Sequence, residues 1–396
     1  MAAKRDVLVG LALVALAGGL GVTSCAMDDL AEAGVAGADE VPLFAVDPLW
    51  PKPLPHPWIL GSVVGVSVDS RDHVWIVHRP DTFDERTEIN AAVSPPTASC
   101  CAPAPPVLEF DPDGNLVGSW GGPGEGYDWP QSNHGITVDH LDNVWVGGNG
   151  QDDSHILKFA RDGTFLAQFG SPRMRGGSHD PVNFWRVAKL SVDPEAGEVY
   201  VADGYGNRRV AVLDASTGEM KRYWGAYGEP PDDGPLPPYD PDAPPARQFR
   251  SPLHCADLSR DGLVYACDRA GDRIQVFRTD GTFVQEVFIE PETLGSGSVW
   301  DIAFSPDPEQ RFLYLADGLN RKIHVIDRES MEVLTRFGGG GRQPGQFYGV
   351  HSIATDSRGN IYTTETWEGK RLQKFSFRGF GTAEPDQGVV WPERAP

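Results

Sequence analysis

The chain repeats one strand–turn–strand module six times, and this repetition constrains its fold more than any other feature. Fixed-period self-similarity is the sequence signature of a repeat architecture. Each module opens with an alternating strand that ends on Asp or Ser, and its second strand carries a central aromatic residue. The opening strands are GVSVD (65–69), GITVD (135–139), KLSVD (189–193), CADLS (255–259), DIAFS (301–305) and SIATD (352–356). The aromatics are Trp75, Trp145, Tyr200, Tyr265, Tyr314 and Tyr362.

Two further strands complete each module, as at Ile156–Phe159 and Thr164–Phe169, which an Asp-Gly turn joins. Four antiparallel strands repeated six times predict an all-β, six-bladed β-propeller. A generic β-sandwich has no reason to repeat one aromatic position six times. The last module lacks a fourth strand after Arg378, and the run Val41–Trp50 has the character to supply it. We therefore expect an N-terminal strand to close the ring and remove open sheet edges.

The N-terminus reads as a targeting segment. Lys4 and Arg5 precede an apolar run over Val7–Leu20, which is short for a bilayer span, and Val22-Thr23-Ser24-Cys25 resembles a bacterial lipoprotein signal. We predict an exported protein, periplasmic or extracellular, with Cys25 lipidated as an anchor to the bacterial envelope. An ordinary secretory signal with an incidental cysteine is the alternative. The predicted organisation is a signal (1–25), an acidic linker (26–40), the propeller (41–380) and a C-terminal tail (381–396).

The net charge of the chain argues against one class of binding partner. The formal net charge is −22, with 34 Lys and Arg against 56 Asp and Glu. Phosphate binding needs a basic surface, so we expect no nucleic-acid partner. A local cationic pocket for a small molecule or peptide remains compatible with this balance. The sequence does not indicate an oligomeric state.

The cysteines suggest disulfides, and the prolines identify two loops. Cys255 and Cys267 flank a hairpin turn, which makes them a candidate disulfide in an oxidising compartment. Cys100 and Cys101 are adjacent, and pairing with each other, pairing elsewhere and staying reduced are all open. Two insertions, residues 81–106 and 228–248, are rich in proline and must be loops because proline cannot continue a β-ladder. We expect both on a rim of the propeller, where loops carry specificity.

Histidines fall on alternate modules when the six are laid in register. In a six-bladed ring, modules two, four and six lie about a third of a turn apart, and the first strand of each blade lines the central channel. Three imidazoles should therefore converge on the axis, and three His with an open fourth position is the catalytic zinc pattern, although other first-row metals also suit imidazole. The six equivalent residues are Val64, His134, Ala188, His254, Trp300 and His351.

The loops after each second strand should surround the same mouth, because strand two runs antiparallel to strand one. They carry Arg79, Tyr205 and Arg269. Arginines over a metal suit an anionic or carbonyl-bearing substrate, and a tyrosine beside them is a candidate general base. The competing interpretation is that Arg79 and Arg269 form surface ion pairs with Asp81 and Asp268.

Several phrases carry a family resemblance: SNHGITVD (132–139), ADGYGNRRV (202–210), SPLHCADLS (251–259), CDRAGDRIQVF (267–277) and GVHSIATD (349–356). They resemble the NHL-repeat propeller of peptidyl-α-hydroxyglycine α-amidating lyase, from about residue 61 to 375. The resemblance implies a zinc held by His134, His254 and His351, with Tyr205 as base and Arg79 and Arg269 in the active site. It also implies cleavage of an N–Cα bond in a peptide ending in α-hydroxyglycine, which releases the amide and glyoxylate.

The sequence departs from the family pattern around the third histidine. The family has Met two residues before it and Asp directly after it, where this chain has Gly349 and Ser352. That Asp is linked to a structural calcium in the family, so its absence argues against calcium here. The alternative function is a non-catalytic NHL propeller that binds proteins or envelope ligands. A calcium-dependent lactonase-like propeller is disfavoured because hard cations need oxygen ligands, whereas the axis offers imidazole.

Overall fold

The computed structural model describes residues 40–392 except residues 85 and 87. All of these belong to one compact unit that begins at Ala36. The predicted signal segment, Cys25 and the linker up to residue 39 lie outside the described residues. None of the helices in the described part of the chain has the length and apolar character that a membrane crossing requires.

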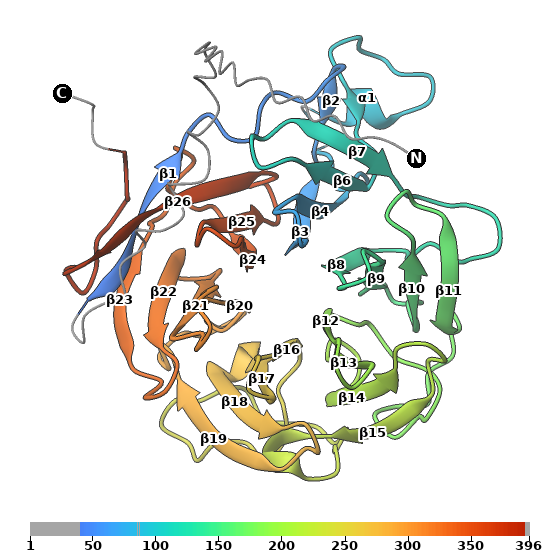
Figure 1. Ribbon diagram of the computed structural model, residues 1–396. Coiled ribbons are helices and arrows are strands. Elements are labelled where there is room, and N and C mark those ends of the chain that lie inside the picture. The colour runs from blue at the N-terminus through green and yellow to red at the C-terminus, as the bar shows by residue number, and fades with distance from the viewer. Residues whose placement is uncertain (1–39, 85, 87, 393–396) are drawn as a thin grey trace, which may run out of the picture. The chain divides into compact units, whose positions relative to one another are not determined.

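Six four-stranded antiparallel sheets are arranged around a common centre, which confirms the predicted six-bladed β-propeller (Figure 1). Blade 1 contains β3 (Ser62–Val68), β4 (Val74–Arg79), β6 (Val107–Phe110) and β7 (Leu116–Trp120). Blade 2 contains β8 (Asn133–Val138), β9 (Val144–Gly148), β10 (His155–Phe159) and β11 (Phe165–Gly170). Blade 3 contains β12 (Lys189–Asp193), β13 (Glu198–Asp203), β14 (Arg209–Asp214) and β15 (Met220–Trp224).

The second half of the ring follows the same order. Blade 4 contains β16 (Leu253–Leu258), β17 (Leu263–Asp268), β18 (Arg273–Arg278) and β19 (Phe283–Phe288). Blade 5 contains β20 (Asp301–Phe304), β21 (Phe312–Asp317), β22 (Lys322–Asp327) and β23 (Val333–Phe337). Blade 6 contains β24 (Val350–Thr355), β25 (Ile361–Glu365), β26 (Leu372–Gly381) and β1 (Val41–Asp47).

The last blade combines strands from both ends of the propeller. β1 pairs antiparallel with β26, with Val41 opposite Gly381 and Asp47 opposite Lys374. Phe44 is buried in one cluster with Tyr314 of the neighbouring blade 5. The N-terminal strand thus occupies the fourth position that the sequence left open in this module.

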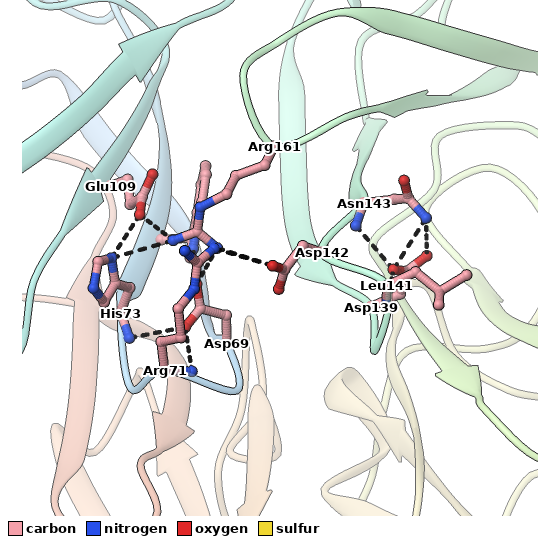
Figure 2. Close-up of polar contacts among 10 residues, drawn as sticks. Asp69, Arg71, His73, Glu109, Asp139, Leu141, Asp142, Asn143 and Arg161 are labelled. Carbon is pink, nitrogen blue, oxygen red and sulfur yellow. Dashed lines mark hydrogen bonds and ion pairs between the residues drawn. The ribbon is translucent and has the colours of Figure 1, made fainter.

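One turn geometry recurs in several blades and explains the repeated Asp and aromatic residues. Asp69 accepts hydrogen bonds from the backbone N–H groups of Arg71 (2.8 Å) and His73 (3.0 Å) and from Trp75 Nε1 (3.0 Å). The carboxylate therefore fixes the turn and ties it to the buried ring of the next strand. Figure 2 shows this turn and the matching turn at Asp139. The pairs Asp139–Trp145 (2.9 Å) and Asp356–Tyr362 (2.9 Å) repeat the bond.

The two Pro-rich insertions are irregular, as predicted. The first holds α1 (Ile89–Ala92) and β5 (Ala102–Pro103), which pairs in parallel with β2 (Trp58–Ile59) from the segment before blade 1. A disulfide joins the adjacent Cys100 and Cys101 there. The second follows β15, and the short 3₁₀ turn η1 (Ala226–Gly228) leads into it.

Candidate metal centre

The structure brings together the three histidines that the sequence placed on alternate blades. Ring centroids of His134, His254 and His351 are 5.1 Å (134–254), 4.8 Å (134–351) and 4.8 Å (254–351) apart. One ligand atom from each lies within 4.8 Å of the other two, and all three side chains are buried. A nearly equilateral arrangement is what threefold placement in a six-bladed ring predicts.

β-bulges aim these side chains at the axis. The pairing register shifts at His134 in β8, at His254 in β16 and at His351 in β24. A bulge places two residues opposite one and redirects a side chain. Gly135 follows His134 with a φ of 70°, and a Cβ there would lie 2.4 Å from the Ala188 carbonyl oxygen. Only glycine therefore fits beside that bulge.

Hydrogen bonds to Nδ1 fix the tautomer of each imidazole. His134 Nδ1 contacts the Ala188 carbonyl oxygen (2.7 Å), and His254 Nδ1 contacts that of Trp300 (2.5 Å). A carbonyl only accepts, so both Nδ1 atoms carry the proton. His351 Nδ1 lies 3.1 Å from Ser352 Oγ, whose hydroxyl donates to the Val64 carbonyl oxygen and so accepts from the ring. All three Nε2 atoms therefore present lone pairs.

The Nε2 lone pairs outnumber the hydrogen-bond donors near them. Tyr205 Oη lies 3.1 Å from Nε2 of both His134 and His254, yet a hydroxyl has one proton to donate. Burial lowers the pKa of all three histidines well below the ordinary value, and nearby arginines lower it further. Neutral imidazoles with an outer hydrogen bond on Nδ1 are the form that binds a metal. The residues present fit a transition metal.

Tyr205, Arg269 and Arg79 surround this centre as predicted. Tyr205 follows β13, Arg269 opens the 3₁₀ turn η2 (Arg269–Gly271), and Arg79 ends β4. Arg269 Nη1 donates to Tyr205 Oη at 3.1 Å, while Arg79 donates to the Asn133 carbonyl oxygen (2.9 Å) and to Asn149 Oδ1 (2.6 Å).

The predicted alternative of surface ion pairs does not describe these arginines. Among the described residues, no carboxylate oxygen lies within 4 Å of the guanidinium of Arg79 or Arg269, and Asp268 pairs instead with Arg273 at 2.8 Å. Burial lowers the pKa of Arg79, against the attraction of more distant anions. Partly buried cations without a close carboxylate favour an anionic ligand at this mouth.

Two neighbours of the centre had no role predicted from the sequence. The Arg186 guanidinium lies 5.7 Å from the Tyr205 ring centroid, held by a bond from Nε to the Asn149 carbonyl oxygen (2.7 Å). Trp300 is buried against His351 and lies under Arg269, whose guanidinium is 4.4 Å from the indole centroid. Trp300 occupies the position in blade 5 that is equivalent to the histidines, and this register could have predicted that it lies at the centre. No such indication exists for Arg186, because this residue precedes the first strand of its blade.

A disulfide between Cys255 and Cys267 braces the centre. Cys255 follows His254 on β16, and Cys267 lies two residues before Arg269 on β17. The bond thus ties the strand of a candidate metal ligand to the strand that leads directly into Arg269.

A lysine lies beside the histidine centre, one residue after the blade 3 position that is equivalent to the histidines. Lys189 Nζ contacts Asp301 Oδ1 (2.7 Å) and Asp257 Oδ2 (2.9 Å), and its side chain is largely buried. Cys255, Asp257 and Asp301 form a second cluster of potential metal ligands. The Lys189 ammonium group already bridges both carboxylates, and Cys255 is disulfide-bonded, so the chain supplies this cluster with its own cation.

A third cluster, Asp69, His73 and Glu109, also contains its own cation. Figure 2 shows the Arg161 side chain from the neighbouring blade reaching between these residues. Its Nη1 lies 2.6 Å from Asp69 Oδ2, and its Nη2 bonds to Glu109. The cluster therefore joins blades 1 and 2. It differs from the histidine centre, where no arginine or lysine among the described residues donates a hydrogen bond to a histidine Nε2.

Fold and site together define a six-bladed β-propeller with a three-histidine candidate metal centre on its axis. No family model matches the sequence. Peptidyl-alpha-hydroxyglycine alpha-amidating lyase 1 of Drosophila melanogaster is 26% identical over 345 residues, which cover 81% of this chain and 58% of that protein. NHL repeat-containing protein 3 of Mus musculus is 26% identical over 305 residues, covering 74% of this chain and 70% of that protein.

A solved structure of a catalytically inactive virginiamycin B lyase from Staphylococcus aureus superimposes with a TM-score of 0.46 at 15% identity, covering 85% of this chain and 88% of that one. By sequence the chain is a distant relative of an NHL repeat-containing protein and of a peptidyl-α-hydroxyglycine α-amidating lyase. It spans little more than half the length of the Drosophila lyase.

Proposed function

We propose that the protein is a metal-dependent lyase, with zinc as the favoured metal, that cleaves an N–C bond in a small carboxylate-bearing substrate of the peptidyl-α-hydroxyglycine type. One observation carries the proposal. Three buried imidazole lone pairs meet beside a tyrosine hydroxyl, and partly buried arginines without close carboxylate partners surround them. The similarity to an amidating lyase adds support for the reaction class.

The chain's own residues suit each requirement of this reaction. The arginines Arg79 and Arg269 would bind the substrate carboxylate, and their charge would hold it at the mouth. Tyr205 would take the proton of the α-hydroxyl, and the Arg269 N–H bonded to its oxygen would stabilise the negative charge. His134, His254 and His351 would hold the metal, which when bound supplies Lewis acidity towards oxygen.

The reaction balances without an oxidant. The substrate hydroxyl loses its proton, a C=O bond forms at the former α-carbon, and the N–C bond breaks with its electron pair passing to nitrogen. The nitrogen takes a proton, which Tyr205 can return, so that an amide and glyoxylate leave. The burial of the centre would limit access of bulk water to these proton transfers.

Replacing Tyr205 with phenylalanine tests the proposal directly. We expect the zinc-loaded wild-type protein to release glyoxylate from an N-acyl-α-hydroxyglycine peptide. Because loss of a positioned general base typically costs about 10²- to 10⁴-fold, Tyr205→Phe should lower kcat by that order without removing the metal. Glyoxylate is measured by its hydrazone absorbance and metal by mass spectrometry.

Tyr223→Phe is the matched control, because Tyr223 lies on the outer strand β15 and its hydroxyl contacts His179 at 3.3 Å. It should retain wild-type turnover. A zinc-loaded wild-type protein that releases no glyoxylate would contradict the lyase proposal and would favour the non-catalytic NHL propeller.

We further propose that the protein is exported and that Cys25 anchors it to the envelope through a lipid. The support is the sequence Lys4–Cys25, with its charged start, short apolar run and small residues before cysteine. In bacteria fed a labelled fatty acid, the wild-type chain should carry the label and sediment with membranes. Cys25→Ala should lose both properties, whereas Cys100→Ala should keep them. An unlabelled wild-type chain would contradict the anchor.

A further inference from the structure

A cavity of about 300 Å³ lies beneath the second Pro-rich insertion. Its volume is at the lower end of the range for small-ligand sites and suits one or two amino-acid residues. The insertion contributes Tyr239 and a series of prolines and alanines, while the propeller contributes Phe288 and residues near η2. A segment that the fold does not require therefore builds most of the wall.

The lining of the cavity is mostly apolar, and one of its cationic groups has no close carboxylate partner among the described residues. Two aromatic rings, Tyr239 and Phe288, form walls together with Pro241, Pro244, Pro245 and Pro291. Proline and aromatic surfaces favour an apolar or aromatic guest, because burial of its surface is the main driving force. Among the charged groups of the lining, Asp268 and Arg273 are bonded to each other at 2.8 Å, and Asp240 accepts from the backbone N–H of Asp242 at 3.0 Å.

Arg250 is the cationic group of the lining that a ligand can reach. Its guanidinium lies 5.3 Å from the Tyr239 ring centroid, and Nη1 donates to the Pro237 carbonyl oxygen at 2.8 Å. Among the described residues it has no carboxylate oxygen within 4 Å. Its remaining N–H groups can donate to a carbonyl oxygen of a bound peptide.

The cavity and the candidate metal centre share a wall. Arg250 lines the cavity, and the next residue, Ser251, donates from Oγ to the Tyr205 carbonyl oxygen at 3.0 Å. Gly271 lines the cavity as well, at the end of the turn η2 that begins at Arg269. Arg269 in turn donates to Tyr205 Oη at 3.1 Å. A substrate bound at Tyr205 could extend over this wall into the cavity.

We propose that this cavity binds the apolar or aromatic side chain of the residue that precedes the reactive end of the substrate. The inference rests on the proposed function and assigns its substrate class, a peptidyl compound with a large apolar penultimate residue. The insertion between β15 and β16 is then a specificity element and Arg250 contacts the peptide backbone.

Binding of two non-reactive probes tests the assignment. N-acetyl-phenylalanyl-glycine and N-acetyl-alanyl-glycine carry the carboxylate but lack the hydroxyl that the reaction consumes. Because burial of a phenyl ring is worth a factor of about 10 to 100, the wild-type protein should bind the phenylalanyl probe that much more tightly in calorimetry. Ala243→Trp, which fills the cavity, should remove most of that preference while the alanyl probe keeps its Kd. Tyr239→Ala, which removes a wall, should also reduce the preference.

Ala196→Trp is the matched control, because Ala196 is exposed in the turn between β12 and β13 and does not line the cavity. It should retain the wild-type preference. Equal binding of the two probes by the wild-type protein, or an unchanged preference in both cavity variants, would overturn the assignment. Glyoxylate release is measured separately: turnover without a phenylalanyl preference refutes the cavity alone, whereas a preference without turnover refutes the lyase.

Discussion

Replacement of His254 with alanine is expected to reduce the metal content of the purified protein from about one transition metal per chain to nearly none. Loss of an outer-shell partner alone typically costs 10- to 100-fold in metal affinity, and loss of a ligand should cost more. The same result is expected for His134 and His351, because each supplies one of three converging Nε2 atoms. Mass spectrometry after dialysis against a weak chelator measures the content.

His140→Ala is the control for this series. His140 is exposed in the turn after β8 and belongs to no ligand cluster among the described residues. It should keep the full metal content, and circular dichroism should show folded β-structure in every variant. A wild-type protein that holds no metal after incubation with zinc would contradict the candidate centre, and the histidines would then be a structural feature of the axis.

Replacement of Lys189 with methionine is expected to destabilise the propeller by about 3–5 kcal/mol, the usual cost of leaving a buried ion pair without one partner. Lys189 contacts two carboxylates that come from blades 4 and 5. Without its ammonium group, Asp257 and Asp301 repel each other in a buried site. The midpoint of urea unfolding at pH 7 measures the loss.

The destabilisation should depend on pH. Burial raises the pKa of Asp257 to about 6 despite the attraction of Lys189, and burial raises the pKa of Asp301 as well. A carboxyl whose pKa is raised in the folded state contributes stability below its unfolded pKa, about 3.9, and loses that contribution as the pH rises through about 6. Removal of the ammonium group raises both values further. The stability difference between wild type and Lys189→Met should therefore shrink between pH 7 and pH 5.

Two variants separate this effect from simple loss of packing. Lys52→Met removes an exposed lysine that bonds to Asn115 and should change stability by less than about 0.5 kcal/mol. The double variant Lys189→Met with Asp257→Asn removes one of the two uncompensated charges and should recover part of the loss. Equal stability of Lys189→Met and wild type at pH 7 would show that the carboxylates do not depend on the ammonium group.

Much of the fold was accessible from the sequence because its units are local. The Asp69–Trp75 turn spans seven residues, and its carboxylate, backbone N–H groups and indole all come from one segment. Repetition of that turn identifies the blades, and the occurrence of His134, His254 and His351 on alternate modules locates the axis. The positions of Arg79, Tyr205 and Arg269 followed from strand direction alone.

Other features depend on contacts between distant residues. Lys189 and Asp301 are separated by 112 positions, and neither residue type nor spacing indicated that they meet. Arg186 lies outside the repeated strands, so no register argument reached it. The cavity under the second insertion required the backbone path of a Pro-rich loop, which lacks the periodic pattern that makes strands readable.

The sequence by itself determined a sixfold strand repeat and placed one imidazole on every second blade, three in all, because short segments contain both the side-chain alternation and the turn residues. Only the tertiary structure shows that bulges direct those imidazoles to one point and that Lys189 lies between Asp257 and Asp301 beside them. It also decided that a loop encloses a cavity beside Tyr205. Such features arise from packing between blades, where the partners are far apart in the chain.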